Sequence, residues 1–248
     1  MSNQHVALTT SLTTHFETPR ASFRPPRLSG TRLTIVGASR GTGALAASLA
    51  CEAGATVVAV SRSARSAAGQ LAPQRDRGDG SLTHFAADAT DSEALRPALV
   101  GATAVLVTVG APGRDRGRVR ERVTAATIAA MRDSGTQRLI VQSSLGIGET
   151  AFRLTPAMRY LVFPFVLRAA IADHRVQEAI VRSSGLEWTI LRPGKLTEGR
   201  PGPPLALPDA SDVPIRGQVA RIDLATWALS ALSDATTIGH AFQVVTAR

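Results

Sequence analysis

Cysteine, tyrosine and lysine each occur only once in this chain of 248 residues, and aromatic residues make up only 4% of it. A single cysteine, Cys51, excludes an intrachain disulfide and a cysteine-rich metal site, and we expect it to be a small buried residue. Scarce aromatic side chains argue against a nucleic-acid surface built on base stacking. No apolar run reaches the ~18 residues of a membrane span, since the longest, residues 161–172, contains Pro164 and Arg168. We therefore expect no metal, no nucleic acid and no membrane among its partners.

The shortage of lysine bears on the net charge, which is +9. Lysine occurs only at Lys195, so arginine supplies almost all of the 28 basic side chains. This skew, together with abundant alanine, is typical of biased codon usage. The arginines are spread along the chain apart from one cluster at residues 114–122. That cluster could attract an acidic ligand, but alternating basic and acidic residues favour the solvated start of a helix.

Residues 1–29 differ in composition from the rest of the chain. They are rich in serine, threonine, arginine and proline, and Glu17 is their only acid. A secretory signal would need a continuous apolar core, which this segment lacks, although an acid-poor, Arg/Ser-rich leader does resemble an organellar transit peptide. We interpret residues 1–29 as a disordered tail, residues 30–248 as a single folded domain, and the protein as cytoplasmic.

From residue 31 onward, apolar β-branched runs alternate with helical patterns. The expected strands are residues 32–36, 56–60, 82–86, 104–109, 138–142, 187–191 and 241–245. The expected helices are residues 43–53, 92–99, 119–134, 166–184 and 222–232. This alternation predicts an α/β domain with a Rossmann-type, doubly wound parallel sheet and right-handed crossovers. We expect the proline-rich stretch 200–208 to be an insertion near the C-terminal side of the sheet.

The most informative segment is the turn at residues 37–43, which follows an apolar run and precedes an alanine-rich stretch. Gly37 can adopt the positive φ of a tight turn, Gly41 lets backbone N–H groups approach a phosphate, and Gly43 lets the helix pack close to the strand. The positive end of the helix would then face the phosphate. The pattern predicts dinucleotide binding, with an ordinary strand-to-helix turn as the alternative. The expected contacts are Gly37, Ser39, Arg40, Gly41, Thr42 and Gly43.

The end of the second strand distinguishes the two nicotinamide cofactors. A protein that prefers NAD usually places Asp or Glu there, bound to the ribose 2′-OH. This strand ends at Ser61 and Arg62 instead, and an arginine beside a hydroxyl suits a 2′-phosphate. Arg40, within the glycine turn, would supply a second positive group. We therefore expect NADP rather than NAD, the alternative being that Arg62 is a solvated loop residue.

Two further strand ends are expected at the same site. Asp88 and Ala89 follow the third strand, where an acid can accept a hydrogen bond from the adenine amino group or cap the next helix. For Asp88 both interpretations stay open, whereas for Asp91 we favour the helix cap. Gly110 and Ala111 end the fourth strand, where small residues would let a cofactor lie close to the backbone.

These residues resemble a known family. The turn 37–43, the pair Ser61 and Arg62, Asp88, and the segment SGLEWTILRPG at residues 184–194 are together similar to the atypical short-chain dehydrogenases/reductases. The resemblance is greatest to the NAD(P)-binding group that includes biliverdin/flavin reductase and NmrA-like proteins, and it covers residues 31–248. The SGLEWTILRPG segment is the most diagnostic part, because in the family it ends in the strand that walls the substrate pocket.

The resemblance implies a catalytic serine followed by Tyr-x3-Lys, in which the tyrosine donates a proton and the lysine binds the nicotinamide ribose. This sequence departs from that pattern. Its only tyrosine, Tyr160, has Pro164 four residues later. The family places a glutamate four residues after the lysine, and counting back from Glu178 puts His174 at the lysine position and Ala170 at the tyrosine position. The usual proton donor is therefore missing.

Three candidates for chemistry remain. Ser144 follows the fifth strand at the position of the family serine, while the adjacent Ser143 is interpreted as a strand-end residue. His174 could bond the nicotinamide ribose or relay a proton, or else pack as an ordinary helix histidine. Lys195 could hold an anionic substrate or stabilise an oxyanion, or else be a solvated loop residue.

The sequence thus predicts an NADP(H)-dependent reductase without the Tyr-x3-Lys pair, which positions hydride donor and acceptor. Conjugated or aromatic carbonyls, quinones, flavins and polyketide ketones suit this chemistry, because they delocalise the charge that a hydride leaves. The alternative is a non-catalytic, NADP-sensing regulator or scaffold of the NmrA-like kind. We expect a small-molecule substrate and a monomer or homodimer.

Overall fold

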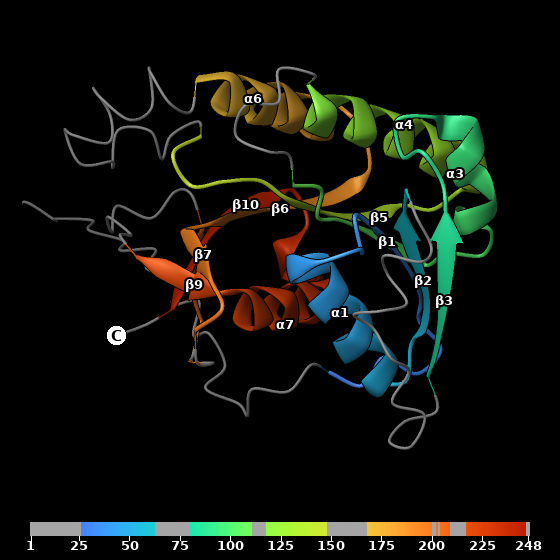
Figure 1. Ribbon diagram of the computed structural model, residues 1–248, viewed down its shortest axis with the longest axis horizontal. Helices are drawn as coiled ribbons and strands as arrows, with labels where there is room; N and C mark the ends of the chain where they lie inside the picture. Colours follow the sequence, from blue (N-terminus) through green and yellow to red (C-terminus); the bar gives the residue numbers. More distant parts are fainter. Residues whose placement is uncertain are drawn as a thin grey trace, which may run out of the picture.

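The computed structural model describes residues 26–62, 80–110, 118–147, 168–199, 202, 204–208 and 217–246. Its main sheet has eight strands with helices on both faces (Figure 1). The strands are β1 (Arg32–Val36), β2 (Thr56–Ser61), β3 (Ser81–Ala86), β4 (Ala104–Val107), β5 (Arg138–Gln142), β6 (Glu187–Pro193), β8 (Pro204–Pro208) and β10 (His240–Thr246). The helices are α1 (Gly41–Glu52), α3 (Ser92–Leu99), α4 (Val119–Ser134), α6 (Arg168–Arg182) and α7 (Arg221–Leu232), followed by a 3-10 turn, η3 (Ala235–Thr237).

The strand order is β3-β2-β1-β4-β5-β6-β10-β8. All neighbours pair in parallel except β10 and β8, which are antiparallel. Val36, the last residue of β1, lies opposite Val60 of β2 and Val107 of β4. The order of the strands reverses at β1, and ligands of such sheets bind beyond the carboxyl ends of the strands at this reversal. The predicted Rossmann-type sheet is therefore confirmed, with one antiparallel edge strand added.

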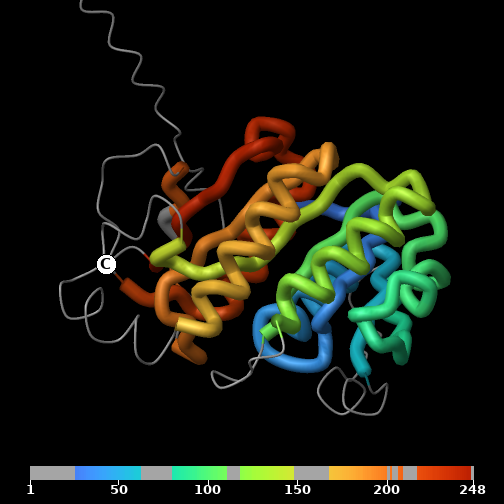
Figure 2. Tube along the Cα trace, turned by 90° about the horizontal axis from the view of Figure 1, so that it is seen from above, coloured from blue at the N-terminus to red at the C-terminus, as the bar shows by residue number. Residues whose placement is uncertain are grey.

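Each face of the sheet has its own apolar core. Along β1, Ile35 belongs to the core beneath α1 and α7, whereas Val36 belongs to the core beneath α3 and α4. This alternation follows from the two-residue period of a strand, and nearly continuous apolar runs are what a sheet covered on both faces requires. Figure 2 shows α4 and α6 lying side by side over one face. No helix in the described ranges is long and apolar enough to cross a membrane.

The proline-rich stretch differs from its prediction as a simple insertion. Its second half, β8 (Pro204–Pro208), pairs with β10 at the edge of the sheet. Proline is tolerated at an edge, since one side of such a strand needs no ladder hydrogen bonds. A separate two-stranded sheet, also not predicted, pairs β7 (Lys195–Thr197) with β9 (Gln218–Ala220) in parallel.

The folded part of the chain begins earlier than the expected boundary at residue 29. Leu28 is only 1% exposed and belongs to the core beneath α1. Its backbone N–H donates to the carbonyl of Ala53 at the end of α1. The tail expected over residues 1–29 was therefore drawn at least two residues too long, and residues 1–25 lie outside the described part.

Candidate functional site

The glycine turn lies at the carboxyl end of β1, where one glycine is required by its backbone conformation and another by close contacts. Gly37 has φ +94°, which favours glycine. A Cβ at Gly43 would lie 2.3 Å from Thr108 Oγ1 and 2.5 Å from the carbonyl oxygen of Gly37. Helix α1 can therefore start this close to the end of β4 only if residue 43 has no side chain, as the sequence predicted.

The first turn of α1 has no side-chain cap, which leaves its backbone N–H groups available to an anion. Arg40 precedes the helix in an extended conformation, and neither its side chain nor any acidic residue in the first turn caps the helix. Thr42 is only 5% exposed, yet its Oγ1 has no hydrogen-bond partner in the described structure. Free helical N–H groups beside an unpartnered buried hydroxyl fit a phosphate, so these residues fit the dinucleotide that the glycine pattern predicts.

Arg221 stands at the same turn and was missed by the sequence reasoning. It is the first residue of α7, which packs beside α1 (Figure 1). Its Nε lies 3.4 Å from the place that a Cβ on Gly41 would occupy, and its Nη1 forms an ion pair with Glu198. An arginine at a helix N-terminus, where the helix dipole disfavours a cation, was the available sequence signal.

The end of β2 brings together the residues expected at the adenosine. Ser61 is buried, whereas Arg62 is exposed. Asp88 Oδ1 accepts hydrogen bonds from the backbone N–H of Thr90 at 3.0 Å and from its hydroxyl at 2.9 Å. These bonds, and then the nearby charges of Arg122 and Arg62, lower the pKa of Asp88. Arg62 therefore lies close enough to Asp88 for their charges to interact.

Asp91, rather than Asp88, caps the following helix. Its Oδ1 accepts from the backbone N–H groups of Glu93 at 2.9 Å and Ala94 at 3.4 Å, at the N-terminus of α3. The preferred interpretation of Asp91 is thus confirmed, and Asp88 instead closes its own local turn.

Strand β4 is shorter than the sequence predicted. Strand β4 ends at Val107, three residues before Gly110. A Cβ added at Gly110 would meet nothing within 4 Å, so no packing contact inside the described structure requires glycine there. Ala89 is half-buried after β3, and Ala111 lies outside the described residues.

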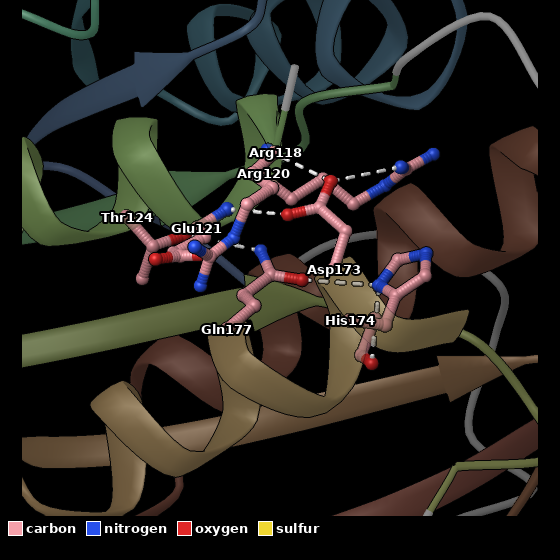
Figure 3. Close-up of polar contacts among 8 residues, drawn as sticks. Arg118, Arg120, Glu121, Thr124, Asp173, His174 and Gln177 are labelled. Carbon is pink, nitrogen blue, oxygen red and sulfur yellow. Dashed lines mark hydrogen bonds and ion pairs between the residues drawn. The ribbon is translucent and has the colours of Figure 1, made fainter. Parts of the chain in front are cut away.

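A buried polar seam joins the start of α4 to α6 (Figure 3). Asp173 of α6 accepts from the backbone N–H of Arg120 at 3.1 Å, from its Nη1 at 3.3 Å, and from the backbone N–H of Glu121 at 2.9 Å. Asp173 thereby caps α4, whose own preceding residue, Arg118, has φ 52° and provides no side-chain cap. Arg120 is accordingly buried, whereas Arg118 and Arg122 are exposed, so one arginine departs from the expected solvated helix start within the described part of the cluster.

His174, which the resemblance places at the lysine position, is buried. Its Nδ1 lies 3.0 Å from Gln177 Oε1 (Figure 3) and 3.4 Å from Ser143 Oγ. Burial, followed by the charge of Arg120, lowers its pKa to about 4. Gln177 Nε2 donates to Thr124 Oγ1, so Oε1 faces the ring and Nδ1 carries the hydrogen in this arrangement. Nε2 is then left as an acceptor, with no partner in the described structure.

Ser143 has a structural role that the sequence did not assign to it, whereas the proposed role of Ser144 stays a prediction. Ser143 is buried, and its hydroxyl donates to Glu178 Oε1 at 2.6 Å. Glu178 also holds the fully buried Arg192, whose Nε donates to Oε1 at 3.0 Å. Ser144 is only half-buried, with its Oγ 3.2 Å from the carbonyl of Leu145. Ser143 therefore supports a buried ion pair instead of merely ending a strand, and Ser144 has the freer hydroxyl.

Lys195 begins β7 directly beyond the end of β6, and its side chain is exposed. Its backbone N–H donates to the carbonyl of Gly217 at 3.2 Å, which anchors the two-stranded sheet. The parallel strands β5 and β6 are neighbours, so Ser144 and Lys195 follow two adjacent strand ends. Within the described ranges, no group of three or more His, Cys, Asp or Glu residues could hold a metal.

Comparison with solved structures shows a shared fold at low sequence identity. Oxidoreductase ylbE from Lactococcus lactis matches with a TM-score of 0.71 and 18% identity over 88% of this chain and 92% of that one. ChuY, an anaerobillin reductase from Escherichia coli O157:H7, matches with a TM-score of 0.68 and 24% identity over 87% of this chain and 97% of that one. A short-chain dehydrogenase/reductase from Veillonella parvula in complex with NADP matches with a TM-score of 0.70 and 18% identity over 87% of this chain and 94% of that one.

A search among curated proteins finds no match to this sequence. A family model described as NAD(P)H-binding matches residues 37–235, from the first glycine of the turn to just beyond α7. This span contains the open N-terminus of α1, the end of β2 and the α4–α6 seam. The expected relation to NAD(P)-binding proteins is thus confirmed, and the chain belongs to the NAD(P)H-binding family.

Proposed function

We propose that the protein is an NADP(H)-dependent reductase of the atypical short-chain type that works without a Tyr-x3-Lys pair. The observation that carries the choice of NADP is Arg62, exposed at the end of β2, where an NAD-binding protein usually has an acid. An arginine there suits a 2′-phosphate through charge-assisted hydrogen bonds, and Arg40 at the glycine turn adds a second positive charge.

The proposed cofactor contacts follow the strand ends around β1. The free N–H groups of α1 and Thr42 Oγ1 would hold the phosphates, and Arg62 the 2′-phosphate. The remaining proposed contacts are Gly37, Ser39, Gly41, Gly43, Ser61, Asp88, Ala89, Gly110 and Ala111. A bound NADPH would supply the hydride.

The chain's own residues limit where the proton originates. With a pKa of about 4, His174 is neutral at pH 7 and holds no proton on Nε2 in its favoured tautomer. It is therefore a poor general acid, and we assign it to accepting a hydrogen bond from the nicotinamide ribose. Ser144 and Lys195 remain beside the proposed substrate site, together with water or the substrate itself as proton sources.

The substrate class follows from the missing proton donor. Flavins, quinones, polyketide ketones and other conjugated or aromatic carbonyls accept a hydride without concerted protonation, because the charge is delocalised. One protein of the same fold is described as an anaerobillin reductase, which is compatible with a conjugated substrate.

Calorimetric titration of the full chain with NADPH and NADH tests the cofactor choice. We expect tighter binding of NADPH, and Arg62→Asp should weaken NADPH binding by about 1.5–3 kcal/mol, the scale of a hydrogen bond to a charged group, while changing NADH little. Arg96→Asp, an exposed arginine on α3, is the matched control. Equal affinities of the unmodified protein for both cofactors would contradict the proposal.

A second measurement separates the reductase from a cofactor sensor. NADPH oxidation is followed with a panel of flavins, quinones and fused aromatic ketones. Turnover that falls in Ser144→Ala, with NADPH affinity unchanged, supports a reductase with a hydroxyl at the reacting oxygen. NADPH binding without turnover of any panel member would favour the NADP-sensing alternative.

A further inference from the structure

One charged pair lies at the glycine turn without a part in the function proposed above. Strands β7 and β9 pair in parallel, with Thr197 opposite Ala220. The next residues along each strand are Glu198 and Arg221, and they form an ion pair. The ion pair therefore lies directly after the last paired residues of the small sheet, at the N-terminus of α7.

Arg221 also faces the first turn of α1. Its Nε and Cδ lie 3.4 Å and 3.6 Å from the place of a Cβ on Gly41. The buried Thr42 Oγ1, with no hydrogen-bond partner in the described structure, belongs to the next residue of this turn. An anion bound by the N–H groups of α1 would thus lie within reach of the Arg221 side chain.

The groups around the N-termini of α1 and α7 carry more positive than negative charge. The positive ends of α1 and α7 both open here, and a cation at a helix N-terminus is unfavourable. Asp223, in the first turn of α7, is buried and accepts from the backbone N–H of Gly202 and the hydroxyl of Thr246. Glu198, whose side chain is 77% exposed, is therefore the only carboxylate that the described structure pairs with Arg221.

We propose that Arg221 binds the diphosphate of the dinucleotide, and that Glu198 holds the same guanidinium when the diphosphate is absent. The carboxylate and the cofactor then compete for one arginine. A guanidinium presents several donors in a planar fork, which suits either partner. Because Glu198 continues the strand that begins at Lys195, the competition links cofactor occupancy to the strand on the substrate side. The inference rests on the proposed function only for dinucleotide binding, and it is independent of the preference for NADP.

Binding titrations of the full chain, without turnover, test the competition. The ligands are NADPH, NADH, ADP and 2′-AMP, of which only 2′-AMP lacks a diphosphate. Arg221→Met should weaken binding of the three diphosphates by a common factor of about 10-fold or more and leave 2′-AMP unchanged. Arg221→Lys should fall between, because lysine keeps the charge but loses the fork.

The variant Glu198→Gln should change diphosphate affinity in the opposite direction. Removing the competing carboxylate should tighten all three diphosphates by about 2- to 5-fold, the scale of an exposed ion pair. Glu93→Gln, an exposed acid paired with Arg96 on α3, is the control and should change nothing. In the double variant Glu198→Gln with Arg221→Met, the gain from Glu198→Gln should disappear, which a double-mutant cycle reports directly.

Two results would overturn the inference. One is unchanged affinity of Arg221→Met for NADPH and NADH. The other is weaker diphosphate binding by Glu198→Gln, which would mean that the ion pair only supports the small sheet. Neither result touches the proposed NADP preference, which is read from the ratio of NADPH to NADH affinity and should respond to Arg62→Asp but not to Arg221→Met.

Discussion

At the scale of single residues, the glycines of the first turn differ in why they are glycine. Gly37 is required by its positive φ and Gly43 by contact, since backbone and Thr108 occupy the space of its side chain. A Cβ at Gly110, although this residue lies near the same site, would meet no atom of the described residues within 4 Å. Close packing and backbone conformation are thus separate reasons that one motif combines.

Gly43→Ala and Gly110→Ala form a matched pair that tests this distinction. Alanine has the higher helix propensity, by about 1 kcal/mol, but at Gly43 a Cβ only 2.5 Å from the carbonyl oxygen of Gly37 forces the backbone to move. We expect Gly43→Ala to destabilise the fold by about 1–3 kcal/mol and to weaken NADPH binding. Gly110→Ala should unfold like the unmodified protein. Urea unfolding of both variants checks this, and equal stabilities would contradict it.

His174 predicts a specific dependence of stability on pH. Its pKa falls from 6.5 to about 4 on folding, so the unfolded chain binds the proton more readily. Above pH 6.5 the lowered pKa takes almost nothing from the free energy of unfolding. As the pH falls toward 4, the free energy of unfolding decreases by up to about 3 kcal/mol. Between pH 7.5 and 4.5, the unmodified protein should therefore lose about 2–3 kcal/mol more stability than His174→Asn. Parallel curves would show that the histidine does not carry the effect, and His240→Asn, at an exposed site, is the control.

The sequence identified residues whose role is local and missed those whose role depends on distant contacts. The turn glycines and the Asp91 cap follow from positions adjacent in the chain. Ser143, in contrast, has a role only because its hydroxyl donates to Glu178 on α6. Arg221 lies near the glycine turn only because α7 packs beside α1. The spacing of residues along the sequence predicts neither contact.

At the scale of elements, helix α4 depends on its neighbour for its start. Asp173 of α6 accepts from two of its first backbone N–H groups, a task that a residue preceding the helix usually performs. The two helices that flank the proposed nicotinamide end are thus joined by one carboxylate.

Asp173→Ala should therefore destabilise the protein by about 2–4 kcal/mol, since it removes a helix cap and the carboxylate that binds Arg120. Asp133→Ala is the control and should cost less than about 1 kcal/mol, because within the described residues Asp133 forms only an exposed pair with Arg96. Denaturant unfolding of both variants measures the difference. Similar losses for the two would mean that the cap contributes little.

Elements with a strong local pattern were predicted best. The expected bounds of α3 and α4 agree with the structure, because apolar periodicity and a following glycine act within each segment, and α3 also has its local cap at Asp91. Strand β8 was missed, since prolines at both of its ends read as a loop. Its pairing with β10 becomes visible only when the sheet is assembled.

At the scale of the whole molecule, the sequence placed the N-terminal boundary from composition, whereas packing sets it. A chain that begins at Pro26 keeps Leu28 in the core, and one that begins at Gly30 loses it. Burying a leucine contributes about 1.5–3 kcal/mol, so we expect the shorter chain to melt about 4–10 °C lower. Leu28→Ala in the full chain should lower the melting temperature in the same direction. Equal melting of the two shortened chains would contradict the assignment of Leu28 to the core.

The two edges of the sheet differ in their capacity to accept another strand. Edge strand β8 begins at Pro204 and ends at Pro208, and neither proline has a backbone N–H to donate. The opposite edge strand, β3, contains neither proline nor lysine, the residues that usually block strand addition. If the protein aggregates on heating, growth by strand addition should therefore proceed from β3. A lysine placed at the exposed Thr83 of this strand would be the economical way to suppress it.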